Sequence, residues 1–201
     1  MNKKFTAIAL SALMLAPAFS VANAQFVDQS NYVNQISITN ANGDNGQTFT
    51  PTYGNSAGAG IQLLGYYGGA TANLFVQLRT AYAGSILATG STVFTLGAGQ
   101  TAMIDAFWAP VAVTAGTQYY LSFMTDDANV FTAQASYTSD FYSGGGLVYY
   151  GSDYTAYGYD FTFEEFASEA VVATPEPASM VLLTTGLVGV FGVARRRKTA
   201  A

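Results

Sequence analysis

Acidic side chains are the first candidates for chemistry in this sequence, because it contains neither cysteine nor histidine. Their absence excludes a Ser-His-Asp or Cys-His nucleophile and any zinc or copper site that relies on thiolate or imidazole. A glycosidase needs two acids about 5 to 10 Å apart in one cleft. Asp126-Asp127 and Glu164-Glu165 are neighbours, which an extended strand directs to opposite faces. An active site would need acids from different strands, such as Asp105 with Asp126, and we expect no enzymatic activity.

Oxygen-donor residues gather at two places: residues 40–46, which include Gly43 and Gly46, and residues 126–129, which include Asp126 and Asp127. Calcium takes six to eight oxygen ligands, and extracellular sites have Kd values of about 10⁻⁴ to 10⁻³ M. Neither cluster has the EF-hand spacing, and Asn, Asp and Gly are also the usual residues of turns. The pattern leaves a weak calcium site at Asp126 and Asp127 open beside an ordinary turn. No other cofactor is expected.

Aromatic residues supply the third candidate site. Six tyrosines interleaved with Gly and Ser lie between residues 142 and 159. Flat aromatic faces stack on sugar rings, although tyrosine is equally a common strand residue. The candidate glycan contacts are Trp108, Tyr149, Tyr150 and Tyr154.

Charge is distributed very unevenly along the chain. Six of the seven basic residues lie near the two ends, so Arg79 is the only Lys or Arg between residues 25 and 173. Eleven acids lie in the same range, which gives this part a formal charge of −10. Phosphate binding depends on Lys and Arg, so nucleic acid is excluded as a partner.

The segments that must position these side chains have the residue pattern of β-strands. Apolar and polar residues alternate with period two at 36–39, 74–79, 119–124 and 159–164. Turn signals separate them at 42–46, 54–55, 68–69, 97–99, 115–116, 126–127 and 144–146. Short strands at this spacing predict a single antiparallel β-sandwich with little helix. Residues 46–50, 74–78, 85–89, 110–121 and 159–163 together resemble bacterial extracellular jelly-roll sandwiches, which speaks for the fold and not for a site.

Residues 174–201 combine three features in a fixed order. Pro175, Glu176 and Pro177 form a unit that cannot lie inside a helix. The uncharged residues 178–194 would form a transmembrane helix of about 26 Å, slightly shorter than a hydrocarbon core of about 30 Å. A stop-transfer cluster on the cytoplasmic side follows, consisting of Arg195, Arg196, Arg197 and Lys198.

This arrangement resembles the PEP-CTERM sorting signal of bacterial exported proteins. The resemblance implies processing by an exosortase, a membrane transpeptidase that cuts near Pro175–Pro177. It also implies transient residence in the inner membrane of a Gram-negative host that makes exopolysaccharide. An ordinary single-pass anchor is the alternative, and such an anchor needs no Pro-Glu-Pro unit.

The other end of the chain is typical of a secretory signal peptide. Lys3 and Lys4 precede an apolar stretch at residues 5–19, and Ala22 and Ala24 provide the small-x-small pattern that signal peptidase accepts. We therefore expect residues 1–24 to be removed. Residues 25–173 remain as an ectodomain large enough for one core.

These observations predict an exported, exosortase-processed protein of the cell surface or extracellular matrix. We expect it to be non-catalytic and either structural or glycan-binding in exopolysaccharide or biofilm. Two alternatives stay open: a secreted carboxylate-based enzyme acting on polysaccharide, and a protein-binding adhesion module. Two acids in one open cleft would favour the enzyme, and a flat exposed tyrosine patch without a cleft would favour the adhesion module.

Overall fold

The computed structural model describes residues 23–39, 45–66, 69–127 and 131–170. All of them except Ala170 belong to one compact unit, Asn23–Glu169. Of the predicted signal peptide and its cleavage site, only Asn23 and Ala24 fall in the described part, where β1 begins. The sorting residues Pro175–Pro177, the segment 178–194 and the basic cluster 195–198 lie outside the described residues.

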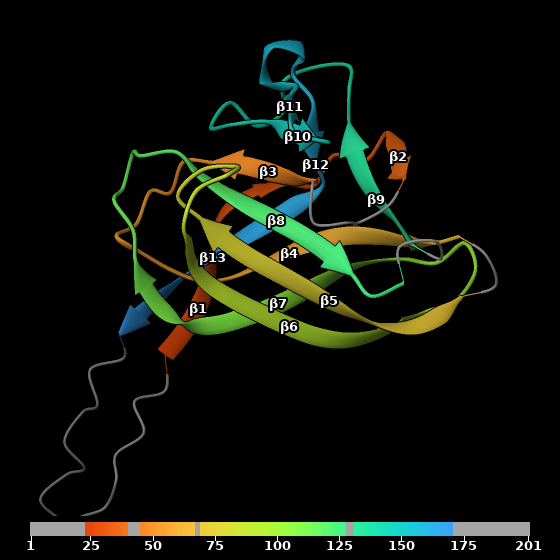
Figure 1. The fold of residues 1–201 in the computed structure, drawn as a ribbon, viewed down its shortest axis with the longest axis horizontal. Helices are drawn as coiled ribbons and strands as arrows, with labels where there is room; N and C mark the ends of the chain where they lie inside the picture. The colour runs from red at the N-terminus through yellow and green to blue at the C-terminus, as the bar shows by residue number, and fades with distance from the viewer. Residues whose placement is uncertain (1–22, 40–44, 67–68, 128–130, 171–201) are drawn as a thin grey trace, which may run out of the picture. The chain divides into compact units, whose positions relative to one another are not determined.

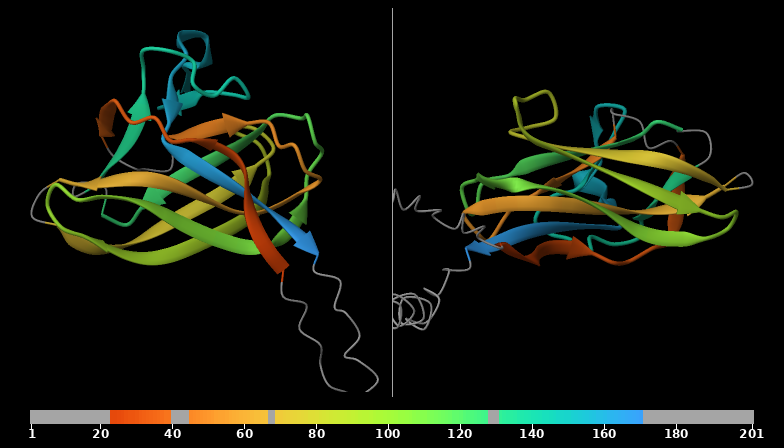
Figure 2. Two further views of the ribbon diagram at one scale, coloured as in Figure 1. Left: turned by 180° about the vertical axis from the view of Figure 1, so that it is seen from behind. Right: turned by 90° about the horizontal axis from the view of Figure 1, so that it is seen from below.

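Two antiparallel sheets form the unit, which confirms the prediction of a β-sandwich (Figures 1 and 2). The first sheet contains β1 (Asn23–Asn31), β2 (Ile36–Thr39), β4 (Asn55–Gly65), β7 (Thr101–Ala112), β9 (Phe131–Ser136), β12 (Asp160–Phe161) and β13 (Phe163–Ala170). The second contains β3 (Gly46–Phe49), β5 (Ala70–Arg79), β6 (Ile86–Leu96), β8 (Tyr119–Thr125), β10 (Leu147–Tyr149) and β11 (Ser152–Asp153). Helix in the described ranges is limited to the 3₁₀ turn η1 (Thr155–Tyr157).

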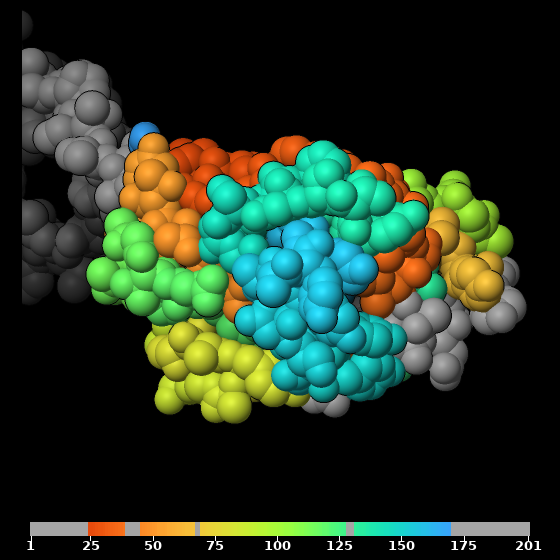
Figure 3. Space-filling view, turned by 90° about the horizontal axis from the view of Figure 1, so that it is seen from above, coloured from red at the N-terminus to blue at the C-terminus, as the bar shows by residue number. Residues whose placement is uncertain are grey.

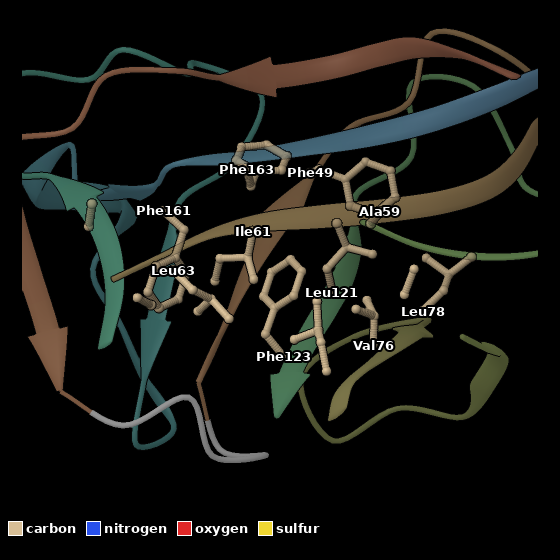
Figure 4. Packing of buried hydrophobic residues seen from close by; sticks show 14 of the residues in the cluster. Phe49, Ala59, Ile61, Leu63, Val76, Leu78, Leu121, Phe123, Phe161 and Phe163 are labelled. Carbon is tan, nitrogen blue, oxygen red and sulfur yellow. The ribbon is translucent and has the colours of Figure 1, made fainter. Parts of the chain in front are cut away.

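The hydrophobic core fills the space between the two sheets, as Figure 4 shows. On β5, Leu74, Val76 and Leu78 point into this core and are fully buried, so the period-two prediction is confirmed there. Leu121 and Phe123 of β8 do the same. Burial of such side chains stabilises the fold by about 1.5 to 3 kcal/mol each.

β4 is a strand that the sequence did not predict. It follows the predicted turn at residues 54–55 and runs through the first sheet with β7 on one side and β13 and β9 on the other. Ala59, Ile61 and Leu63 supply its core face. Gly58 and Gly60 lie on its outer face, where a neighbouring side chain occupies the space that a Cβ would need.

The segment predicted as one strand at 159–164 is divided. β12 ends at Phe161 and pairs with β9, whereas β13 begins at Phe163 and pairs with β4. Phe161 and Phe163 both point into the core, and the backbone N–H of Thr162 between them donates to Gln134. The chain therefore passes from one neighbour to the next without losing its buried face.

The chain enters and leaves the sandwich away from β10 and β11. β1 begins and β13 ends at the lower left of Figure 1, whereas β10 and β11 lie at its top. No helix within residues 23–39, 45–66, 69–127 and 131–170 is long and apolar enough to cross a membrane.

Candidate functional site

A pocket of about 320 Å³ lies between β2 and the segment from β10 to β12. Aromatic and aliphatic side chains and one serine line it: Ile36, Ser37, Ile38, Leu147, Tyr149, Tyr154 and Tyr159. Figure 3 looks onto this end of the molecule, where residues 147–160 (cyan to blue) stand beside β2 (orange-red). The pocket falls at the lower end of the size range for small-ligand sites, which are typically apolar with a few polar groups.

Backbone hydrogen bonds tie the pocket's tyrosine wall together. The Leu147 N–H donates to the Tyr159 carbonyl at 2.7 Å, and the Tyr154 N–H donates to the Leu147 carbonyl at 2.9 Å. Between them, β10 and β11 form a tight hairpin in which Tyr149 pairs with Ser152. Tyr150 and Gly151 make the turn with φ of 46° and 75°, the positive values that two-residue hairpins require.

A buried acid fixes this segment to the sandwich. Asp160, next to Tyr159, accepts hydrogen bonds from the Gln47 amide at 3.0 Å and the Tyr142 N–H at 3.2 Å. Gln47 in turn accepts from the Phe161 N–H at 2.8 Å. Burial raises the pKa of Asp160 to about 6, although the hydrogen bonds from Gln47 and Tyr142 act in the opposite direction.

The opposite wall of the pocket comes from β2. Ile36 and Ile38 pair with Ala135 and Ala133 of β9, so their side chains share one face of the strand. Ser37 accepts a hydrogen bond at 2.7 Å from the amide of Gln134. The aliphatic wall is therefore held by strand pairing, independently of the tyrosine segment.

Stacked rings give the pocket its shape. Tyr154 and Tyr159 are parallel within 4°, with ring centroids 5.7 Å apart. Tyr157 packs on the same cluster, with its ring centroid 5.9 Å from that of Tyr159, and is 68% exposed. Flat apolar faces with phenolic hydroxyls suit a ligand that has a C–H face and a hydroxylated edge.

The predicted glycan contacts fall in three different settings. Tyr149 and Tyr154 line the pocket. Tyr150 projects from the hairpin tip, half exposed, with its ring 4.5 Å from that of Tyr149. Trp108 is a core residue, 8% exposed, and its indole N–H donates to the Ser56 carbonyl at 3.1 Å. A ring so covered has no face for a sugar, so Trp108 is not part of the candidate site.

Five pocket residues were not among the predicted contacts: Ile36, Ser37, Ile38, Leu147 and Tyr159. Tyr159 belongs to the tyrosine-rich stretch, and that richness is a signal that could have included it. Nothing in the sequence brings β2, more than 100 positions earlier, to the same place.

Asp126 and Asp127, the proposed calcium residues, lie at the end of β8. Asp126 is exposed, and its two carboxylate oxygens accept from the Asn73 backbone N–H at 2.8 Å and the Asn73 amide at 2.7 Å. These hydrogen bonds lower the pKa of Asp126. Among the described residues, no three His, Cys, Asp or Glu side chains gather for a metal ion. A weak site completed by backbone and water oxygens remains a prediction.

Two acids do meet across strands, but they are not the pair suggested from sequence. Asp105 of β7 and Glu164 of β13 both lie opposite Gly60 on the outer face of the first sheet. Burial, followed by the hydrogen bond and charge of Glu164, raises the pKa of Asp105 to about 7. The Tyr32 hydroxyl donates to Glu164 at 2.7 Å.

Comparison with known proteins supports the assignment of the C-terminal segment. Residues 173–198 match the PEP-CTERM protein-sorting motif. The chain therefore carries the signal of an exported, exosortase-processed protein that reaches the cell surface.

Other comparisons add little. No curated protein matches the chain. A solved structure described as "EclA C-terminal domain; sugar-binding protein" is similar at 16% identity over 65% of this chain and 86% of that chain, with a TM-score of 0.29. A similarity this weak defines neither the fold nor the ligand of the present protein.

Proposed function

We propose that this exported protein is a non-catalytic glycan-binding component of the cell surface or extracellular matrix, and that the tyrosine pocket is its binding site. The observation that carries the proposal is the convergence of Tyr149, Tyr154 and Tyr159 on one pocket of about 320 Å³. That volume accommodates one or two sugar rings. The aromatic faces would pack against the C–H face of a ring while the phenolic hydroxyls bond to its edge.

The position of the pocket supports a surface role. The sorting motif follows β13 in the sequence, and β13 ends at the lower left of Figure 1, away from β10 at the top. A protein attached through its processed C-terminus would therefore present the pocket away from the attachment point. Such a component would hold the exopolysaccharide that we expect the host to make.

The acids of the described region favour binding over hydrolysis. Asp105 and Glu164 are in hydrogen-bonding contact with each other. Glycosidases keep their two carboxyl groups about 5 to 9.5 Å apart, because a sugar or a water must fit between them. A hydrogen-bonded pair leaves no such space.

The test is glycan binding by the exported protein, measured on an array of bacterial polysaccharide fragments and then by calorimetric titration. We expect Tyr154→Ala to weaken binding of the selected glycan at least tenfold, because one stacking face is removed. Tyr53→Ala is the matched control, since Tyr53 is 47% exposed, packs on Phe26 and lines no part of the pocket. Equal loss in both variants, or unchanged affinity in Tyr154→Ala, would refute the proposal.

A further inference from the structure

Arg79 is the single basic residue among the described residues, and no carboxylate contacts it there. Its guanidinium donates to Gln77 Oε1 through Nε and Nη2, and to the Tyr82 carbonyl through Nη1 at 3.4 Å. All of these partners are neutral. In a domain with eleven acids, the one cation is thus left without a counter-charge in the described structure.

The guanidinium lies in a shallow groove of about 90 Å³ on the outer face of the second sheet. Phe75, Gln77 and Arg79 of β5 line one side, and Ser122 and Met124 of β8 line the other. The strand register places Phe75 opposite Met124 and Gln77 opposite Ser122. The groove therefore has an apolar end and a polar, positively charged end within one strand pair.

The polar end presents hydrogen-bond donors. Arg79 donates to the side-chain oxygen Oε1 of Gln77, which leaves the side-chain NH₂ group of Gln77 without a hydrogen-bond acceptor among the described residues. A guanidinium carries five N–H groups in a planar fork, and one hydrogen on each Nη of Arg79 is still unused. Donors of this kind match a carboxylate, which accepts in a bidentate manner.

We propose that this groove binds the carboxylate of an acidic sugar residue, a uronic acid within a polysaccharide chain. Arg79 and Gln77 would hold the carboxylate, and the partly buried Phe75 with the 40% exposed Met124 would contact the C–H face of the same or the next sugar. The inference rests on the proposed function only in taking the ligand to be a glycan. It assigns a second site, on other strands than the tyrosine pocket.

The test uses two probes that differ only in charge: an oligosaccharide of glucuronic acid and its carboxyl-reduced, neutral form. The exported protein and the variants Arg79→Gln and Tyr154→Ala are titrated with both. We expect Arg79→Gln to weaken binding of the acidic oligosaccharide about tenfold and to leave neutral-glycan binding unchanged. Tyr154→Ala should keep the acidic-sugar response that depends on Arg79.

The outcomes separate this proposal from the previous one. Acidic-sugar binding that is unchanged in Arg79→Gln, or absent in the unmodified protein, overturns the Arg79 groove whatever the tyrosine pocket does. Neutral-glycan binding that is unchanged in Tyr154→Ala, beside acidic-sugar binding that Arg79→Gln weakens, would refute only the tyrosine pocket. Displacement by inorganic phosphate with equal affinity would overturn the assignment to a sugar acid. If the unmodified protein self-associates, Arg79→Gln abolishes this association and no oligosaccharide binds, the groove contacts a second copy of the chain instead.

A second measurement protects against a folding artefact. In the unmodified protein, the acidic oligosaccharide should shift the NMR resonances of the Gln77 side-chain amide and the Ser122 backbone amide, while those of Tyr154 stay in place. Shifts confined to the tyrosine pocket would contradict the proposal.

Discussion

The neighbouring residues Glu164 and Glu165 of β13 point to opposite sides of the first sheet. A carboxyl group meets a different environment on each side. Glu165 points inward, is fully buried, and neither of its oxygens meets a hydrogen-bond partner at normal distance among the described residues. Burial raises the pKa of Glu165 to about 8, against a small opposing effect of the Ser56 hydroxyl. Glu164 points outward, where Tyr32 donates to it and Asp105 lies beside it.

This difference shows how the fold accommodates carboxyl groups on the two sides of the first sheet. On the outer face, a glycine makes room for two carboxyl groups, and Asp105, whose pKa is raised by burial and then by Glu164, keeps its proton within a hydrogen bond to Glu164. On the inner face there is no partner, so Glu165 is accommodated by holding its proton. The predictions below test first the inner side, then the outer side, and then an acid that lies on neither.

The largest effect is expected from Glu165→Gln. A carboxyl group whose pKa rises on folding binds its proton more tightly in the folded state, so stability is lost as pH rises from about 4.5 and the loss is complete above about 8. Glu165→Gln removes this loss and should stabilise the protein by about 3 to 5 kcal/mol at pH 9, and by little at pH 4. Urea unfolding at the two pH values measures the difference.

The control for this substitution is Glu169→Gln, an exposed glutamate on the same strand. It should leave the pH dependence of unfolding unchanged. If both variants behave like the unmodified protein at pH 9, Glu165 is solvated and the contrast between the two sides of β13 is wrong.

A smaller effect is expected from Gly60→Ala on the outer side. The new Cβ would lie 2.0 Å from Asp105 Oδ1 and 3.1 Å from the Ile104 carbonyl, so the Asp105 side chain must rotate away from Glu164. We expect a loss of about 1 to 3 kcal/mol in the free energy of unfolding. Because the contact with Glu164 is lost, the pKa of Asp105 should also fall from about 7 toward its usual value, which NMR titration of its carboxyl carbon measures.

Gly54→Ala provides the comparison, since the nearest atom to its Cβ would be the Val113 carbonyl oxygen at 3.9 Å. That variant should change stability by no more than about 0.5 kcal/mol. An unshifted Asp105 in Gly60→Ala would mean that Glu164 does not influence it.

The smallest effect concerns Asp126, an exposed acid held by Asn73. If Asp126 and Asp127 bind calcium with a Kd of about 10⁻³ M, adding 1 mM Ca²⁺ after EDTA treatment stabilises the protein by about 0.4 kcal/mol. Asp126→Asn should abolish this increment, whereas Glu169→Gln should retain it. An unchanged thermal midpoint on adding Ca²⁺ would rule the site out.

Local alternation predicted part of this fold well. The patterns at 74–79 and 119–124 gave strands whose apolar side chains fill the core. β4 was not predicted because Gly58 and Gly60 weaken the strand pattern of its sequence. The reason for these two glycines appears only in the structure, where side chains of a neighbouring strand occupy the space that a Cβ would need. Likewise Tyr120 reads as an outward residue, yet it is fully buried because Tyr82 packs edge-on against it.

The candidate site was partly foreseen. Tyr149 and Tyr154 were selected from the density of tyrosines in their stretch, and both line the pocket. The opposing wall at Ile36 and Ile38 could not be foreseen, because its position depends on pairing between β2 and β9 across about 100 residues. The sequence did not predict whether Trp108 is buried in the core or exposed at the surface, because the alternation near it fits both.

The amino-acid sequence by itself determined the class of this protein: alternating residues made it a β-sandwich, and the ordered Pro-Glu-Pro, apolar and basic segments made it an exosortase substrate. Both signals are local, because strand periodicity and a linear sorting motif need no distant partner. Tertiary structure alone decided which tyrosines share a pocket, which acids touch and which acid is buried. Those properties arise from side chains that only strand pairing brings together.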